Sequence, residues 1–177
     1  MAKITSRPVR VVVSGGESTG KTTLAEQLGK EYGAPVLPEY LRKFVATKGS
    51  LPDESDVSLI AIGHLAQVSA ASPLEAELLI FDTDLVSTVT YQHFYFGSCP
   101  SWIEGLAVKE MADLYLVCDI DIPYTPDAGM RDSEEARDDV QAELLARLRG
   151  LGANIVLLSG SLSQRTQVAI KAINEVV

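Results

Sequence analysis

The chain has 177 residues, of which 46% are hydrophobic and 22% are charged, a balance typical of one globular domain. Its formal net charge of −9 argues against a surface that wraps DNA or RNA, because nucleic-acid binders carry clustered positive charge. The apolar stretch after the first basic residues is too short for a signal peptide, and no apolar run approaches the length of a membrane span. We therefore expect a single domain over residues 1–177, in the cytoplasm, with no nucleic-acid or membrane partner.

Apolar, strand-like runs recur at five places along the chain, and helix-like stretches separate them. The runs cover residues 9–14, 36–38, 78–81, 114–118 and 155–158. Because they are continuously apolar rather than alternating, they predict buried strands of a mainly parallel sheet with helices on both faces. The expected fold is a three-layer α/β sandwich with a five-stranded sheet.

A glycine-rich loop follows the first of these runs and fits the pattern G-x-x-x-x-G-K-[ST] at every fixed position. In this pattern, backbone N–H groups wrap the α- and β-phosphates of a nucleotide, Lys21 reaches the β/γ oxygens, and the Thr22 hydroxyl ligates Mg²⁺. The residues predicted to bind nucleotide are Gly15, Gly16, Glu17, Ser18, Thr19, Gly20, Lys21, Thr22 and Thr23. A strand before the loop and a helix-like stretch after it, with Gly33 at the expected helix end, favour this over a turn that binds nothing.

Helix-like periodicity marks three further stretches, over residues 53–72, 134–149 and 163–176. The side chains expected to face inward are Leu59, Ile62 and Ala66 in the first, Val140, Leu144, Leu148 and Leu151 in the second, and Val168, Ala172, Ile173 and Val176 in the third. The stretch 85–96 stays open between strand and helix. Its β-branched and aromatic content suits a strand, but its position directly after an aspartate suits a helix.

Polar residues follow each predicted strand, at the sheet edge where ligands of open parallel sheets bind. Asp82 ends the third strand, where P-loop proteins place a carboxylate that holds Mg²⁺; the alternative is a helix cap. Glu39 ends the second strand and could accept a proton from a substrate hydroxyl; a surface charge or cap partner is the alternative. Asp84 either binds substrate hydroxyls or caps the next helix.

A loop over residues 122–134 has the Pro-, Gly- and Asp-rich composition of a lid. Its Arg131 is a candidate for neutralising transferring phosphates, whereas Arg137, just beyond the loop, is expected to be a solvated charge. A cluster of aromatic residues could form a pocket for a flat ring, although ordinary packing is expected for more than half of its members, Tyr91, Phe94, Tyr95, Phe96 and Trp102. His64 and His93 have no evident catalytic partners.

Several missing patterns narrow the class of protein. The guanine-binding Asn-Lys-x-Asp signature is absent, because neither Asn154 nor Asn174 begins one. Zinc, haem and flavin signatures are absent as well, and an AAA-type motor is not expected because it needs a helical domain after the nucleotide core. These residues therefore favour a small P-loop kinase that transfers phosphate to a small molecule.

Several segments together resemble the ribosylnicotinamide kinase domain of bacterial NadR-type proteins. Residues 15–22 read closely as that family's G-G-E-S-x-G-K-[ST] loop, residues 39–42 as its Glu-Tyr-x-Arg segment, and residues 82–84 as its Asp-Thr-Asp strand end. Residues 127–131 resemble its lid, and residues 161–165 the segment after its last strand. The resemblance extends over roughly residues 9–175 and implies a nucleoside- and nucleotide-kinase-like P-loop NTPase fold.

The resemblance further implies ATP- and Mg²⁺-dependent phosphorylation of the 5′-hydroxyl of nicotinamide riboside to nicotinamide mononucleotide, in NAD salvage. It implies that Thr22 and Asp82 hold Mg²⁺, that Glu39 or Asp82 takes the hydroxyl proton, and that Arg131 neutralises charge as the lid closes. Residues 159–163 would border the adenine. The substrate would contact Glu39, Tyr40, Arg42, Asp84 and Tyr91.

Two other classes remain open: a kinase for another nucleoside, nucleotide or small metabolite, and a nucleotide-dependent switch that hydrolyses ATP slowly or not at all. The candidate acids Glu39 and Asp82, together with a lid arginine, count against a switch, because a switch needs neither a base nor a lid. The oligomeric state stays open, a homodimer included.

Overall fold

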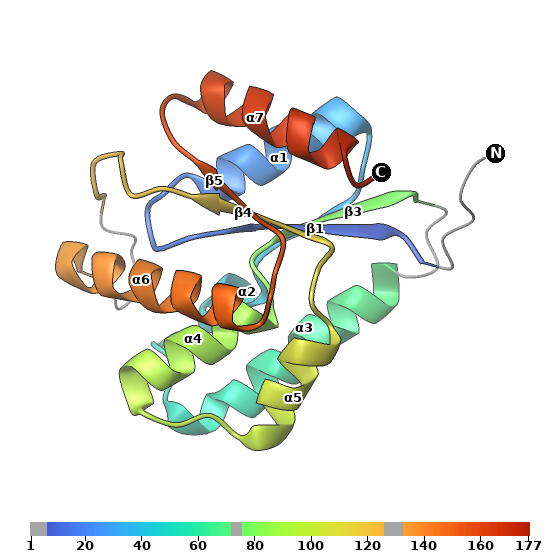
Figure 1. The fold of residues 1–177 in the computed structure, drawn as a ribbon. Coiled ribbons are helices and arrows are strands. Elements are labelled where there is room, and N and C mark those ends of the chain that lie inside the picture. Colours follow the sequence, from blue (N-terminus) through green and yellow to red (C-terminus); the bar gives the residue numbers. More distant parts are fainter. Residues whose placement is uncertain (1–6, 72–75, 126–132) are drawn as a thin grey trace.

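Five parallel strands form one sheet in the residues that the computed structural model describes, 7–71, 76–125 and 133–177 (Figure 1). The strands are β1 Val9–Ser14, β2 Val36–Leu37, β3 Leu78–Asp82, β4 Leu114–Cys118 and β5 Ile155–Leu158. Their order in the sheet is β2-β3-β1-β4-β5, and every neighbouring pair is parallel. Each strand lies where an apolar run predicted it, so the predicted α/β class with a five-stranded sheet is confirmed.

Helices cover both faces of this sheet (Figure 1). They are α1 Lys21–Tyr32, α2 Tyr40–Lys48, α3 Val57–Ala71, α4 Leu85–Phe96, α5 Ser101–Lys109, α6 Glu134–Gly150 and α7 Leu162–Asn174, with a short 3₁₀ turn, η1 Glu54–Asp56, before α3. One core lies between the sheet and α1 and α7, around Leu24 and Ile173. The other lies between the sheet and α3, α4, α5 and α6, around Tyr115 and Leu144. No helix within the described ranges has both the length and the apolar character needed to span a membrane.

The start of α4 settles the stretch that the sequence left open between strand and helix. Asp84 precedes it, and the Oδ1 atom of Asp84 accepts hydrogen bonds from the backbone N–H groups of Val86 and Ser87. These bonds satisfy two of the donors that every helix start leaves without an intrahelical partner. The expected end of α1 is also observed, because Gly33 adopts the left-handed conformation there, with φ 59°.

The inward face predicted for the helix within residues 53–72 is wrong. Leu59 is 58% exposed and Ile62 is 54% exposed, and Ala66 is exposed as well, whereas the opposite face with Ile60 and Ala61 is buried. The sequence of α3 contains no Asp, Glu, Lys or Arg, so hydrophobic periodicity cannot distinguish its two faces.

Two smaller differences concern other helices. Val168 in α7 was expected to face inward, but it is 46% exposed, and its neighbour Ala169 is buried instead. Helices α2 and α5 were not predicted. Both have only nine residues, and α2 fully buries none of them, so it lacks the apolar stripe that marks a helix in a sequence.

Candidate functional site

The P-loop connects β1 to α1 and packs closely against β4. A Cβ added at Gly15, where φ is +135°, would lie 2.7 Å from the carbonyl oxygen of Cys118, so a glycine is required at this position. The side chain of Lys21, the first residue of α1, is buried, and its Nζ donates to the carbonyl oxygen of Gly16 at 2.8 Å. The ammonium group of Lys21 therefore lies inside the loop, at the place where the phosphates of a nucleotide are expected to bind.

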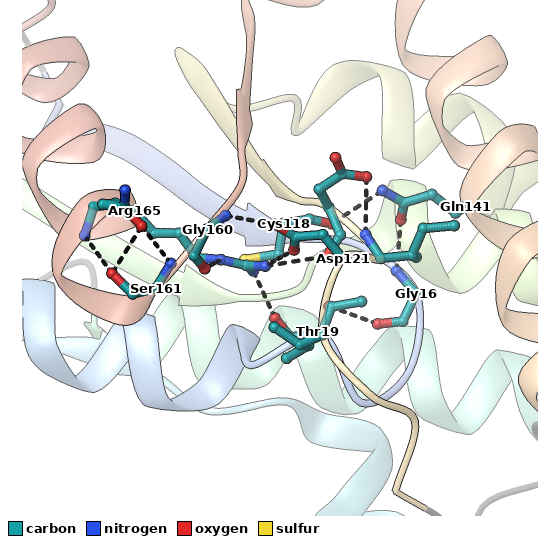
Figure 2. Close-up of polar contacts among 12 residues, drawn as sticks. Gly16, Thr19, Cys118, Asp121, Gln141, Gly160, Ser161 and Arg165 are labelled. Atoms are coloured by element: carbon teal, nitrogen blue, oxygen red, sulfur yellow. Dashed lines mark hydrogen bonds and ion pairs between the residues drawn. The ribbon is translucent and has the colours of Figure 1, made fainter.

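Two side chains from distant helices anchor the P-loop (Figure 2). The backbone N–H of Gly16 donates to the Oε1 atom of Gln141 on α6 at 2.7 Å, and the Nε2 atom of Gln141 donates to the carbonyl oxygen of Cys118 at 3.0 Å. Arg165 on α7 is buried, and its Nη1 donates to the carbonyl oxygen of Thr19 at 2.9 Å. No motif in the sequence pointed to Gln141 as part of the site.

The guanidinium of Arg165 also holds the loops that follow β4 and β5. Its Nε donates to the carbonyl oxygen of Gly160 at 2.9 Å, and its Nη2 forms an ion pair with Asp121 (Figure 2). The carboxylate of Asp121 in turn accepts a hydrogen bond from the N–H of Gly160. Residues 159–163, expected to border the adenine, therefore lie in a segment that Arg165 ties directly to the P-loop.

A candidate Mg²⁺ site lies where β3 ends beside the P-loop. The parallel register pairs Val13 with Asp82, which brings that carboxylate next to the start of α1. The Thr22 hydroxyl donates to the Oδ2 atom of Asp82 at 2.6 Å, and the buried Oδ1 atom of Asp82 has no hydrogen-bond partner among the described residues. One hydroxyl and one carboxylate, completed by phosphate and water, form a donor set suited to Mg²⁺. In the same residues, no group of three or more His, Cys, Asp or Glu side chains could hold a metal by itself.

Glu39 lies two residues beyond β2 and directly before α2, and its side chain is largely buried. Burial raises the pKa of Glu39 from its ordinary value of 4.5 to about 7; the negative charges of Glu17 and Asp82 add to the rise, and the positive charges of Lys21 and Arg42 oppose it. The Nε atom of Arg42 donates to the Oε2 atom of Glu39 at 3.0 Å. A carboxyl group with a pKa near neutrality is suited to accept a proton.

A cleft with an empty volume of about 870 Å³, its open mouth included, begins beside Glu39 and Glu17 and extends between α2, α3 and α4. Its walls are largely apolar and aromatic. Tyr40 packs so closely on α3 that a Cβ at Gly63 would lie 1.9 Å from its Cζ. Other rings in the wall belong to Tyr91, Tyr95 and Phe96, the first two stacked with their centroids 6.3 Å apart.

Three of the five aromatic residues singled out in the sequence therefore line the cleft. The other two, Phe94 and Trp102, are not part of its wall, and Trp102 is 47% exposed. His64 borders the cleft, and burial is the main cause that lowers its pKa to about 4. His93 lies outside the wall and pairs with Glu104 at 2.6 Å.

Asp84 also borders the cleft, but bonds within the protein engage both of its oxygens. Its Oδ1 caps α4, and its Oδ2 accepts a hydrogen bond from the Tyr115 hydroxyl at 2.7 Å. Burial raises the pKa of Asp84. Between the two aspartates, Thr83 adopts a left-handed backbone conformation with φ 64°, which is unusual for a β-branched residue and directs the chain around the cleft edge.

The arginines near the predicted lid divide into two cases. Arg131, with the lid residues 126–132, lies outside the described residues. Arg137 was expected to be a solvated charge, but it is only 4% exposed. Its Cγ lies 2.9 Å from the position of a Cβ at Gly16, its Nη1 donates to the carbonyl oxygen of Ile122 at 3.0 Å, and its guanidinium lies 5.6 Å from the ring centroid of Tyr124. The expectation failed because the stem of Arg137 fills the space beside a P-loop glycine.

A phosphate-binding loop, a strand-end carboxylate and a separate cleft on a parallel sheet define a P-loop nucleotide-binding domain. A family model described as "AAA domain" (AAA_28) matches residues 10–165. The chain belongs to this family.

Curated and solved relatives point to one type of P-loop domain within this fold. The chain is 29% identical over 126 residues to the trifunctional NAD biosynthesis/regulator protein NadR of Salmonella typhimurium, matching over 68% of this chain and 30% of that protein. It is also similar to two crystal structures of NadR, one with NAD and AMP-PNP and one with NR, both at TM-score 0.79 and 28% identity over 95% of this chain. The match spans 49% and 51% of those chains. The expected resemblance to the NadR-type P-loop domain is confirmed.

A thymidylate kinase from Ehrlichia chaffeensis shares the fold at TM-score 0.70 and 17% identity, covering 95% of this chain and 99% of that one. The chain thus has the nucleotide-kinase-like fold that its motifs implied, while it spans about a third of the curated relative and half of the crystallised NadR chains.

Proposed function

We propose that this domain uses ATP to phosphorylate the 5′-hydroxyl of nicotinamide riboside, giving nicotinamide mononucleotide. The NadR crystal structures with AMP-PNP and with NR, the abbreviation of nicotinamide riboside, support both the donor and the acceptor. The observation that carries the proposal is the position of Glu39, a largely buried carboxyl with a pKa of about 7 at the P-loop end of a cleft with apolar and aromatic walls.

The charge of the cleft supports a nucleoside rather than a nucleotide as acceptor. Four of the described residues in its wall are acidic, and none is lysine or arginine; the acids are Glu17, Glu39, Asp53 and Asp84. A nucleoside monophosphate would bring two negative charges into these surroundings, whereas the nicotinamide ring of the riboside is a flat cation. Aromatic faces and carboxylates both attract such a cation, so the Tyr91 and Tyr95 rings suit it.

The proposed reaction assigns one task to each group. Glu39 accepts the proton of the attacking hydroxyl, because its raised pKa makes it a better base than an exposed carboxylate. Lys21 moves from the Gly16 carbonyl to the β/γ-phosphate oxygens. Mg²⁺, held by Thr22 and Asp82, would neutralise charge on the phosphates. Asp82 is the weaker candidate for the base, since one of its oxygens is already bonded to Thr22.

The test is ADP release with Mg-ATP and a panel of acceptors: nicotinamide riboside, the common ribo- and deoxyribonucleosides, nucleoside monophosphates, and no acceptor. Lys21→Ala serves as the blank. We expect rapid, selective turnover with nicotinamide riboside. Turnover with another acceptor alone would contradict the substrate but keep the reaction type, and ADP release that ignores the acceptor would favour a nucleotide-dependent switch.

A further inference from the structure

Glu17 belongs to the P-loop by sequence, yet its carboxylate borders the acceptor cleft. The residue is 5% exposed, and its Oε2 atom has no hydrogen-bond partner among the described residues. A buried carboxylate oxygen without a donor is destabilising by roughly 1–3 kcal/mol or more, so such an atom is expected to have a partner in the working state.

Arg42 does not satisfy this oxygen. Its Nε donates to Glu39 at 3.0 Å, while its Nη2 stays 3.9 Å from the Oε2 atom of Glu17, beyond hydrogen-bond distance. Of these two carboxylates, Glu39 is hydrogen-bonded to Arg42, whereas Glu17 is not. The unpaired Oε2 atom of Glu17 therefore indicates that a molecule bound in the cleft supplies a hydrogen-bond donor.

The chemistry of that donor is restricted. An ionised carboxylate only accepts hydrogen bonds and repels anions, so a phosphate group cannot fill this place. A hydroxyl can. If Glu39 takes the proton of the hydroxyl that is phosphorylated, Glu17, which shares Arg42 with it, lies within reach of a different hydroxyl of the same sugar.

We propose that Glu17 is a specificity-determining residue for the acceptor: its Oε2 accepts a hydrogen bond from a 2′- or 3′-hydroxyl of the ribose and so selects ribosides over deoxyribosides. This inference rests on the proposed function. It gives Glu17 a role in binding the acceptor, whereas the P-loop pattern predicts that this residue binds the nucleotide.

The experiment compares kcat/KM for nicotinamide riboside with that for its 2′-deoxy and 3′-deoxy analogues, in wild type, Glu17→Gln and the control Glu26→Gln. Glu26 is exposed on α1, so Glu26→Gln makes the same chemical change at a position outside the cleft. Wild type is expected to favour the riboside over one analogue by about tenfold or more, the usual effect of losing a hydrogen bond to a charged group. In Glu17→Gln this preference should fall to about threefold or less, and KM for the riboside should rise about tenfold while KM for ATP stays within about twofold.

The outcomes separate this inference from the proposed function. Equal kcat/KM of wild type for all three acceptors would overturn the role of Glu17. This outcome depends on wild type alone, so it does not require the variant to fold. Turnover of nicotinamide riboside with an unchanged preference in Glu17→Gln would overturn it as well, and would leave the proposed function intact. If wild type instead phosphorylates another nucleoside, the proposed substrate fails, and the riboside-to-deoxyriboside ratio for that nucleoside decides the role of Glu17. Turnover with no acceptor overturns both.

Discussion

Replacing Glu39 with glutamine should make the protein more stable at alkaline pH while it abolishes most of its activity. Burial is the main reason that the pKa of Glu39 is raised from 4.5 to about 7. A carboxyl with a raised pKa in the folded state ionises first in the unfolded state, so stability falls as pH rises from about 4.5 to about 7 and stays lower above that range. At about 1.4 kcal/mol per pKa unit, a rise from 4.5 to about 7 means that the ionised Glu39 destabilises the fold by about 3.5 kcal/mol at most.

Urea unfolding of the nucleotide-free protein at pH 5 and pH 8 measures this effect. Glu39→Gln removes the charge and keeps the shape, so its advantage over wild type should be about 2–3 kcal/mol larger at pH 8 than at pH 5. Glu26→Gln, on the exposed side of α1, should show the same pH dependence as wild type. An advantage of Glu39→Gln that does not change between the two pH values would refute the assignment of a buried, ionising carboxyl at this position.

Activity gives an independent readout of the same group. A general base must be deprotonated, so kcat of wild type should rise with pH and level off above about pH 7. Glu39→Gln should lower kcat by about two decades or more with little change in ATP affinity. Near-normal turnover in this variant would remove Glu39 from the mechanism even if the stability result agrees.

The remaining predictions concern packing around the two halves of the site. Gly63→Ala should push the Tyr40 ring out of the cleft wall, because the new Cβ would lie 1.9 Å from its Cζ. We expect a loss of about 1–3 kcal/mol in urea unfolding and a higher KM for the acceptor, while Gly105→Ala, in α5 with nothing within 4 Å, should gain about 0.5–1 kcal/mol. Stabilisation by both alanines would contradict the contact. Gln141→Ala should leave the buried Gly16 N–H unpaired, lowering stability by about 2 kcal/mol and raising KM for ATP rather than for the acceptor; an unchanged KM for ATP would show that this anchor does not position the loop.

The strands, the P-loop and α1 could be predicted because their signals are local: an apolar run, a glycine pattern, a cap. Contacts between distant positions could not. Gly16 and Gln141 are 125 positions apart, and Thr19 and Arg165 are 146 apart, so no window of sequence contains either pair. Residues that follow the strands could be predicted in part. The sequence placed Glu39 at the carboxyl edge of the sheet, but only the structure shows that its side chain is buried.

The lack of Asp, Glu, Lys and Arg in α3 marks a different limit. Its pattern predicts a helix, but the choice of buried face depends on which neighbour is present, and Leu59 and Ile62 carry no information about that. Glu17 shows a third case. Its pattern assigned it to the nucleotide, and the cleft beside its carboxylate follows only from how α2 and α4 pack around it.

The position of Glu17 and Glu39 together in the wall of the cleft bears on how the product of the proposed reaction would leave. Phosphorylation at this point turns an uncharged hydroxyl into an ester with about two negative charges. The new charge would lie beside these carboxylates, and the positive charges nearest to it, Lys21 and Arg42, act on Glu39 from outside the described wall of the cleft. If the proposed reaction holds, Glu17 and Glu39 would weaken binding of the phosphorylated product relative to the acceptor and so would limit product inhibition of the next cycle.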